Sequence, residues 1–199
     1  DRVDKNIELT AQEISDDYFK WLKKGIVNFC CIKLFKRAVI GDIRFSETLK
    51  WGEDGSFNLE VFKRMNKIHI IPEKKYFYVM HPQQTTAKKM KRYTDMMIIH
   101  IGDIDRFIKK FNGYDKQTTR SGMGRTWIAI FLEAVHHCDT LKEYLDAFRK
   151  LKNQPWAIYM KESKELSTRL KIVDMFIKLN RGELIYLIAK KYKKIHSKG

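Results

Sequence analysis

The chain has 199 residues, of which 44% are hydrophobic and only 3 are proline, so its composition is that of a globular protein and not of a disordered chain or a Pro-rich linker. Lysine and arginine number 40 against 24 acidic residues, and the formal net charge of +16 indicates an anionic partner: a phosphate-rich substrate, a nucleic acid or an anionic membrane. The sequence has no run of about 18 apolar residues, which excludes a spanning helix, and its start does not resemble a secretory signal peptide.

The first predicted helix covers residues 11–24. Thr10 and Glu13 have the spacing of a capping box, and apolar residues then recur on one face until Gly25 ends the helix. The run 27–35 that follows is too apolar for an exposed helix. It fits a buried helix or a buried strand equally well.

The three cysteines are Cys30, Cys31 and Cys138. Two adjacent cysteines and a distant third fit neither a disulfide framework nor a zinc site. We therefore expect reduced thiols in a cytoplasmic protein, packed as small hydrophobic side chains.

A second helix is predicted to open at Glu53 or Asp54, because apolar residues recur on one face of the segment that follows. Two strand-like segments come next, 67–71 and 75–80, with a turn at Pro72-Glu73-Lys74 between them. The sequence thus predicts a mixed arrangement of helices and strands up to about residue 86.

Beyond residue 87 the pattern is helical, and we predict two domains, 1–86 and 87–199. Residues 118–124 are predicted to be a polar loop. A second capping box at Thr140 and Glu143 begins a helix that ends near Lys152. Further helices are expected at 127–135, 165–179 and 183–195.

Several short motifs in residues 7–86 occur in a characteristic order. They are Lys33-Leu34-Phe35-Lys36-Arg37, Arg44-Phe45, Glu53-Asp54, a short strand ending in Pro72-Glu73, and Tyr76-Phe77-Tyr78. In this order the set resembles the acceptor-side half of family 2 glycosyltransferases, inverting enzymes with the GT-A fold. The resemblance implies an α/β fragment of that fold over 1–86, followed by a mainly helical region.

The nucleotide-binding half of such enzymes has no counterpart in this sequence. We therefore expect the chain to be part of a longer enzyme and to lack sugar-transfer activity by itself. The resemblance implies Mg²⁺ or Mn²⁺ in the complete enzyme, with the main ligands outside this chain. Asp103-Ile104-Asp105 has the letters of the family's metal motif, but its position in the sequence favours a helix boundary.

The resemblance assigns the catalytic role to a pair of carboxylates. Asp54 maps to the base that takes the proton from the acceptor hydroxyl, with Glu53 beside it. The alternative is that both carboxylates only stabilise the start of a helix. A nucleoside diphosphate leaving group also needs cations, and the candidate phosphate- or substrate-binding residues are Lys33, Lys36, Arg37, His81, Gln83 and Thr85. For Lys36 and Arg37 the alternative is a solvated basic face.

The expected partners are a nucleotide-sugar donor and a saccharide or lipid-linked acceptor used in polysaccharide or glycoconjugate biosynthesis. Residues 184–199 carry five lysines and no acid beside apolar residues, which favours a cytoplasmic enzyme held peripherally at the inner face of an anionic membrane. A second copy of the chain is another candidate partner. The competing function is a basic, non-catalytic module for membrane or nucleic acid, although no RNA-binding signature is present.

Overall fold

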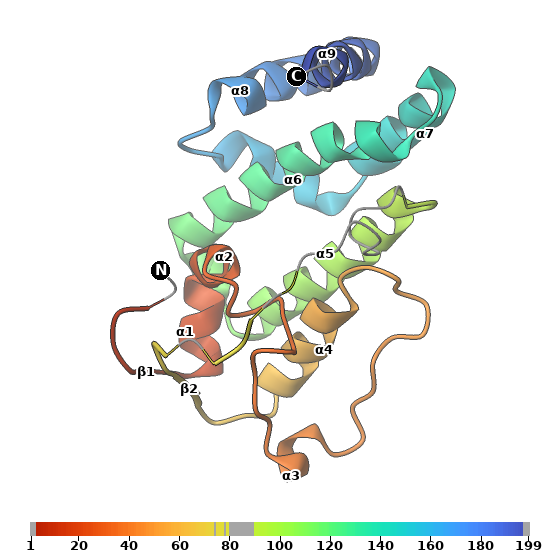
Figure 1. Ribbon diagram of the computed structural model, residues 1–199. Coiled ribbons are helices and arrows are strands. Elements are labelled where there is room, and N and C mark those ends of the chain that lie inside the picture. The colour runs from red at the N-terminus through yellow and green to blue at the C-terminus, as the bar shows by residue number, and fades with distance from the viewer. Residues whose placement is uncertain (1–2, 74, 78, 80–89, 197–199) are drawn as a thin grey trace. The chain divides into compact units, whose positions relative to one another are not determined.

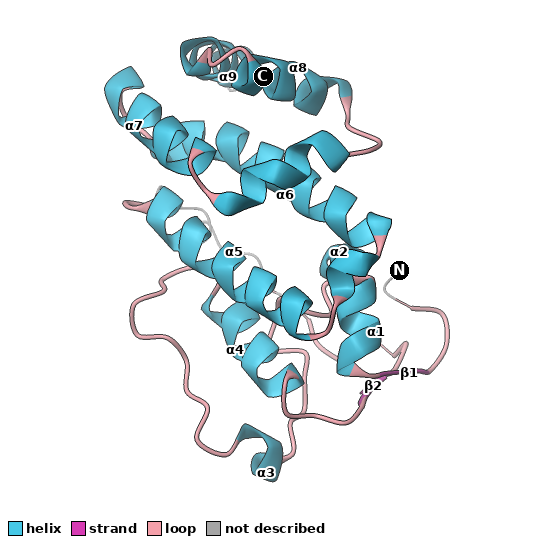
Figure 2. Cartoon of the chain, turned by 180° about the vertical axis from the view of Figure 1, so that it is seen from behind, coloured by secondary structure: helices cyan, strands magenta, loops and turns pink. Residues whose placement is uncertain are grey.

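The computed structural model of the chain describes residues 3–73, 75–77, 79 and 90–196, with side chains up to residue 191. These described residues are 62% helical, and the sheet that they form has two strands. Figure 1 and Figure 2 show the helices and the small sheet. The predicted α/β fragment of the GT-A fold is therefore wrong, and the chain is mainly helical.

The elements, in chain order, are β1 (Ile7–Leu9), α1 (Ala11–Asp16), α2 (Tyr18–Lys23), α3 (Arg37–Ile40), α4 (Glu53–Phe62), β2 (Ile68–Ile70), α5 (Tyr93–Lys110), the 3-10 helix η2 (Gly113–Asp115), α6 (Gln117–His137), α7 (Leu141–Lys152), the 3-10 helix η3 (Pro155–Glu162), α8 (Thr168–Lys178) and α9 (Gly182–His196). None of the helices in the described residues is long and apolar enough to cross a membrane.

Two segments that the sequence allows as strands, 27–35 and 75–80, add no strand to the sheet within the described residues. In the run 27–35, side chains of α4 satisfy backbone groups that a neighbouring strand would otherwise pair. The Asn58 Nδ2 donates to the carbonyl of Val27 at 3.0 Å, and the Cys30 N–H donates to Asp54 at 3.2 Å. Residues 75–77 and 79 are exposed and irregular. The sheet consists of β1 and β2, antiparallel, with Ile7 opposite Ile70.

The chain divides into two compact units. Unit 1 is Asp1–Lys88 with Ile99–Thr119, and unit 2 is Lys89–Ile98 with Arg120–Gly199. The division into 1–86 and 87–199, based on the change to a purely helical pattern, stays a prediction. The largest fully buried side chains of unit 1 are Tyr18, Phe62, Phe107, Ile14, Leu59, Ile101, Ile104 and Ile108, and those of unit 2 are Trp127, Tyr144, Phe131 and Met123.

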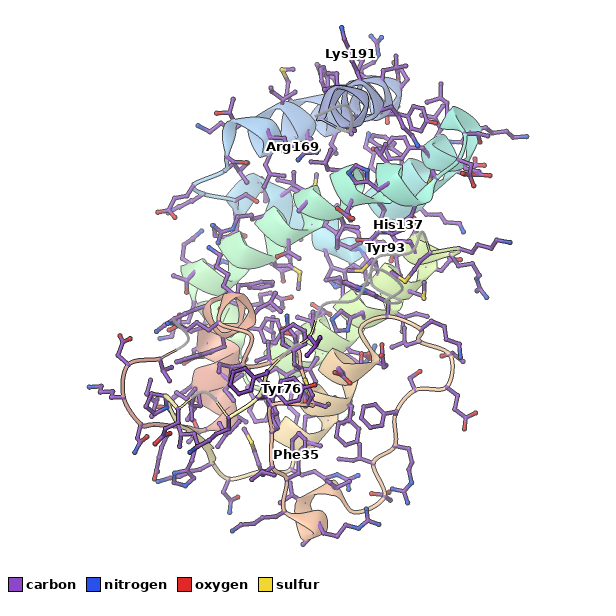
Figure 3. The ribbon with its side chains drawn as sticks, viewed as in Figure 1. Phe35, Tyr76, Tyr93, His137, Arg169 and Lys191 are labelled. Atoms are coloured by element: carbon purple, nitrogen blue, oxygen red, sulfur yellow. The ribbon has the colours of Figure 1, made fainter. Side chains whose placement is uncertain are left out.

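Unit 2 is built on the apolar faces of its helices. Trp127 packs edge-to-face on Trp156, with ring centroids 5.2 Å apart, and the Tyr144 hydroxyl donates to the carbonyl of Phe131 at 3.0 Å. Tyr93 stacks on His137, with ring centroids 4.1 Å apart. Both side chains are labelled in Figure 3.

Local signals in the sequence located several helices well. Both capping boxes are present: Thr10 with Glu13 begins α1, and Thr140 with Glu143 begins α7. The first predicted helix is interrupted at Asp17, which separates α1 from α2. The loop predicted at 118–124 is wrong, because these residues lie within α6.

Candidate active site

The two predicted catalytic carboxylates occupy the first turn of α4, in unit 1. Gly52 is the N-cap, with φ of +81°, and no side chain caps this end of the helix. Glu53 and Asp54 are both partly exposed. Since neither carboxylate caps α4, helix capping does not explain the pair, although both still lie in the favourable field of the helix N-terminus.

The carboxylate of Asp54 is held by the preceding segment. Its Oδ2 accepts a hydrogen bond from the Cys30 N–H at 3.2 Å, whereas Oδ1 accepts none from any described residue. The Glu53 carboxylate makes no hydrogen bond or ion pair within the described part of the chain. Asp54 is thus oriented by the backbone with one oxygen left for another partner.

Asn58, one helical turn after Asp54, fixes the same segment. Its amide donates to the Val27 carbonyl, and its Oδ1 accepts from the Cys30 thiol at 3.2 Å. Burial, and next the charge of Asp54, raise the pKa of Cys30 to about 12. The thiol therefore stays protonated at neutral pH and acts as a hydrogen-bond donor and not as a nucleophile.

A buried polar network lies under this end of α4. The Ser56 Oγ is 2.6 Å from Asp103 Oδ2 and 3.0 Å from His100 Nδ1. The hydroxyl has one proton and gives it to the carboxylate, so His100 Nδ1 must donate to Ser56 Oγ. The network joins α4 to α5, which lie side by side in Figures 1 and 2.

Glycine allows the imidazole to come this close. A Cβ on Gly55 would lie 2.7 Å from His100 Cε1, and one on Gly52 would lie 3.0 Å from His100 Cγ. Trp51 meets the imidazole edge-on, with ring centroids 6.2 Å apart. The sequence Gly52-Glu53-Asp54-Gly55-Ser56 therefore places two carboxylates among small residues. These small residues allow His100 of α5 to pack closely against the start of α4.

His100 is neutral in this environment. Desolvation lowers its pKa, and the nearby Asp103 carboxylate opposes that shift without overcoming it. The hydrogen bonds require a proton on Nδ1, and the neutral imidazole meets this requirement in its Nδ1–H tautomer.

The predicted basic residues lie in the segment before α4. Lys33 follows Cys30 by three residues and donates to the carbonyl of Phe29. Lys36 is the N-cap of α3 and Arg37 its first residue, and both are exposed, as a solvated basic face would be. Phe35, labelled in Figure 3, anchors the segment by packing edge-to-face on Phe57 at 5.8 Å. Their role in phosphate binding stays a prediction.

Three other candidates, His81, Gln83 and Thr85, lie outside the described residues.

The described residues do not fit a metal site. They contain no group of three or more His, Cys, Asp or Glu side chains that could hold an ion. Asp103 is bonded to Ser56 and Arg106, and Asp105 to Tyr114 and Lys109. These two aspartates lie inside α5 and not at a helix boundary, and they serve separate contacts. No step of the chemistry is assigned to a metal.

Sequence reasoning missed Ser56, His100 and Asp103 as parts of this site. The only signal was the pair Gly55-Ser56 directly after the carboxylates. Comparisons with protein-family models, curated proteins and solved structures gave no match to this chain.

Proposed function

We propose that this chain carries the acceptor side of an inverting sugar transferase, with Asp54 as the base that takes the proton from the acceptor hydroxyl. One observation carries the proposal: Asp54 is oriented by the Cys30 N–H, has one oxygen without a partner among the described residues, and lies on a helix end anchored by Ser56, His100 and Asp103. A base fixed in this way meets the positional requirement of proton transfer.

In the proposed reaction the acceptor oxygen forms a bond to the anomeric carbon of a nucleotide-diphosphate sugar. The bond from that carbon to the diphosphate breaks with inversion, and the nucleoside diphosphate leaves with the bonding electron pair. The hydroxyl proton passes to Asp54. Lys33, Lys36 and Arg37 are the cations proposed to stabilise the charge on the leaving diphosphate.

The proposed acceptor is a saccharide or a lipid-linked saccharide used in polysaccharide or glycoconjugate synthesis, in a cytoplasmic enzyme peripheral to the inner membrane face. Donor binding is assigned to residues beyond this chain. Calorimetry of the 199-residue chain with UDP-, GDP- and TDP-sugars is therefore expected to show no binding.

The decisive experiment measures transfer by the natural full-length protein with Asp54→Asn. Turnover should fall by about 10²-fold or more, the usual contribution of a positioned base, while the melting temperature and the KM for the donor stay unchanged. Glu53→Gln should cost less. Glu60→Gln is the matched control, since Glu60 is an exposed carboxylate on the same helix, paired with Lys63.

A variant Asp54→Asn with normal turnover and a lower melting temperature would show that the carboxylate only stabilises the start of α4.

The second candidate function is a basic, non-catalytic module that binds anionic membrane or nucleic acid, and the net charge of +16 favours it. Salt-dependent retention on anionic vesicles and on single-stranded nucleic acid separates those two ligands. In such a module Asp54→Asn would leave retention unchanged, and the full-length protein would transfer no sugar.

A further inference from the structure

We propose that α8 and α9 form a docking surface for an anionic lipid bilayer, which we call the α8/α9 surface. The proposal concerns unit 2 alone and does not depend on the transfer chemistry proposed for unit 1.

Each helix of this pair has an exposed apolar stripe opposite its buried face. On α8 and its C-cap, Ile172, Met175 and Leu179 recur at the helical spacing, while Val173 and Ile177 are buried. On α9, Leu187 and Ile188 are exposed, while Ile185 and Ala189 are buried. The five exposed side chains keep 41% to 61% of their surface accessible, so both stripes lack a covering element in the described chain.

From the sequence alone, a membrane-facing surface is predicted for residues 184–199, which include most of α9. In that segment Leu187 and Ile188 are exposed, and Leu184 is partly buried. α8 and its C-cap add three exposed apolar residues to the two on α9.

A fixed turn joins the two helices, which pack on each other. Asn180 adopts the left-handed conformation, with φ of +57°, and the Arg181 N–H donates to the Phe176 carbonyl at 2.8 Å. The Asn180 side chain accepts from Lys152 Nζ at 2.8 Å. These bonds form a C-terminal cap that fixes the exit from α8, so the two stripes need no ordering before they meet a partner.

The charge beside the stripes selects the partner. From Thr168 to His196 the sequence has eight lysines and arginines and two acids, and both acids are paired: Asp174 with Lys178 at 2.6 Å, and Glu183 with Arg181. Lys171 and Lys191 are exposed next to the stripes, and Figure 3 shows Lys191 on the outer side of α9.

Aliphatic side chains with a basic border match a bilayer, which accepts the former among its acyl chains and the latter at its anionic headgroups. A second copy of the chain would bring two basic surfaces together. Single-stranded nucleic acid would use stacking aromatic side chains, and the exposed large apolar residues of these helices are aliphatic.

The experiment is co-sedimentation of the complete chain with phosphatidylcholine vesicles, with and without about 30% phosphatidylserine, at low and at about 0.5 M salt. Binding is expected only to the anionic vesicles and should weaken at high salt. Met175→Glu with Leu187→Glu should weaken it at least tenfold, and Lys171→Gln with Lys191→Gln about fivefold per lysine.

The matched control is Ile158→Glu with Lys161→Gln, which makes the same kinds of change at exposed positions of η3 in the same unit. It should bind as the unchanged chain does. Circular dichroism melts show whether each variant is folded, and the lysine variants test the surface without inserting charge into an apolar stripe.

The proposal is overturned if the folded chain does not bind anionic vesicles, or if the control variant loses binding to the same extent. It is also overturned if the chain binds a single-stranded oligonucleotide in place of vesicles, or if the α8/α9 variants only dissociate a dimer.

Discussion

Each of the two units is stabilised internally by a different kind of interaction. Nine polar or charged residues, Trp and Tyr not counted, are buried in the described chain, and six of them belong to unit 1: Ser15, Ser56, Asn58, His100, Asp105 and Thr119. Several join segments distant in sequence, such as Ser15 with the Ile108 carbonyl at 3.2 Å. Unit 2 instead centres on the rings of Trp127, Phe131 and Tyr144. Unit 1 should therefore be sensitive to lost hydrogen bonds, and unit 2 to lost volume.

The largest effect is expected from Trp127→Ala in unit 2. Trp127 is completely buried, and its indole N–H has no partner among the described residues, so the substitution removes packing and leaves no polar group behind. We expect the free energy of unfolding to fall by about 3–5 kcal/mol, measured by urea denaturation. Ile158→Ala, at an exposed position, should change it by less than about 0.5 kcal/mol. A loss below about 1 kcal/mol at Trp127 would show that unit 2 does not depend on this ring.

Ser56→Ala in unit 1 should cost about 1–3 kcal/mol, because it leaves Asp103 without one donor and His100 without its acceptor. Hydrogen exchange should become faster in α4 and α5 and stay unchanged in α7. Glu47→Ala, at an exposed position of the same unit, is the control. Equal protection of α4 in both variants would mean that the network does not anchor this helix.

The pH dependence of stability tests the charge state of His100. Its folded pKa lies below the usual value of 6.5, so the unfolded chain binds the proton more readily and acid favours unfolding. The stabilisation is complete above the unfolded pKa and is lost as pH falls from about 6.5 toward the folded pKa. Urea denaturation between pH 7.5 and 5.5 should show a steeper loss for the unchanged chain than for His100→Gln. Parallel curves would contradict a neutral, buried His100.

The smallest effects are expected at the two capping boxes, one in each unit. Thr10→Ala and Thr140→Ala should each cost about 0.5–1 kcal/mol, since each removes the hydroxyl that accepts a hydrogen bond from the N–H three residues further on. Thr10→Ala also removes the hydrogen bond that this hydroxyl donates to the Glu13 carboxylate at 2.9 Å. Thermal melts of the two variants compare how much stability each unit loses when the threonine of its capping box is removed. A much larger loss at Thr10 would indicate that the hydrogen bonds of unit 1 act cooperatively.

Local signals made part of the fold predictable. The box at Thr140 and the stop after Lys152 gave the bounds of α7, because capping and helical periodicity involve residues three or four apart. The run 27–35 was not predictable, since its backbone is satisfied by Asp54 and Asn58, which lie 24 or more residues away. Residues 118–124 have the polar, glycine-rich composition of a loop, yet Ser121 is buried and accepts a hydrogen bond from the Lys164 N–H at 2.8 Å. Small residues there permit close packing against the segment that follows η3.

The candidate site was likewise predictable only where its residues are close in sequence. Motif order singled out Glu53 and Asp54, and the structure places both at the start of α4. His100 and Asp103 are more than 40 residues further along the chain, and a helical period alone gives no reason to pair them with Ser56.

The contact between Trp51 and His100 gives this region its own optical reporter. A protonated imidazole next to an indole quenches indole fluorescence more strongly than a neutral one. Among the ring contacts of the described residues, Trp51 is the tryptophan that meets a histidine. Emission from Trp51 should therefore follow the protonation of His100, and the state of the network beneath the two carboxylates can be read in solution without a label.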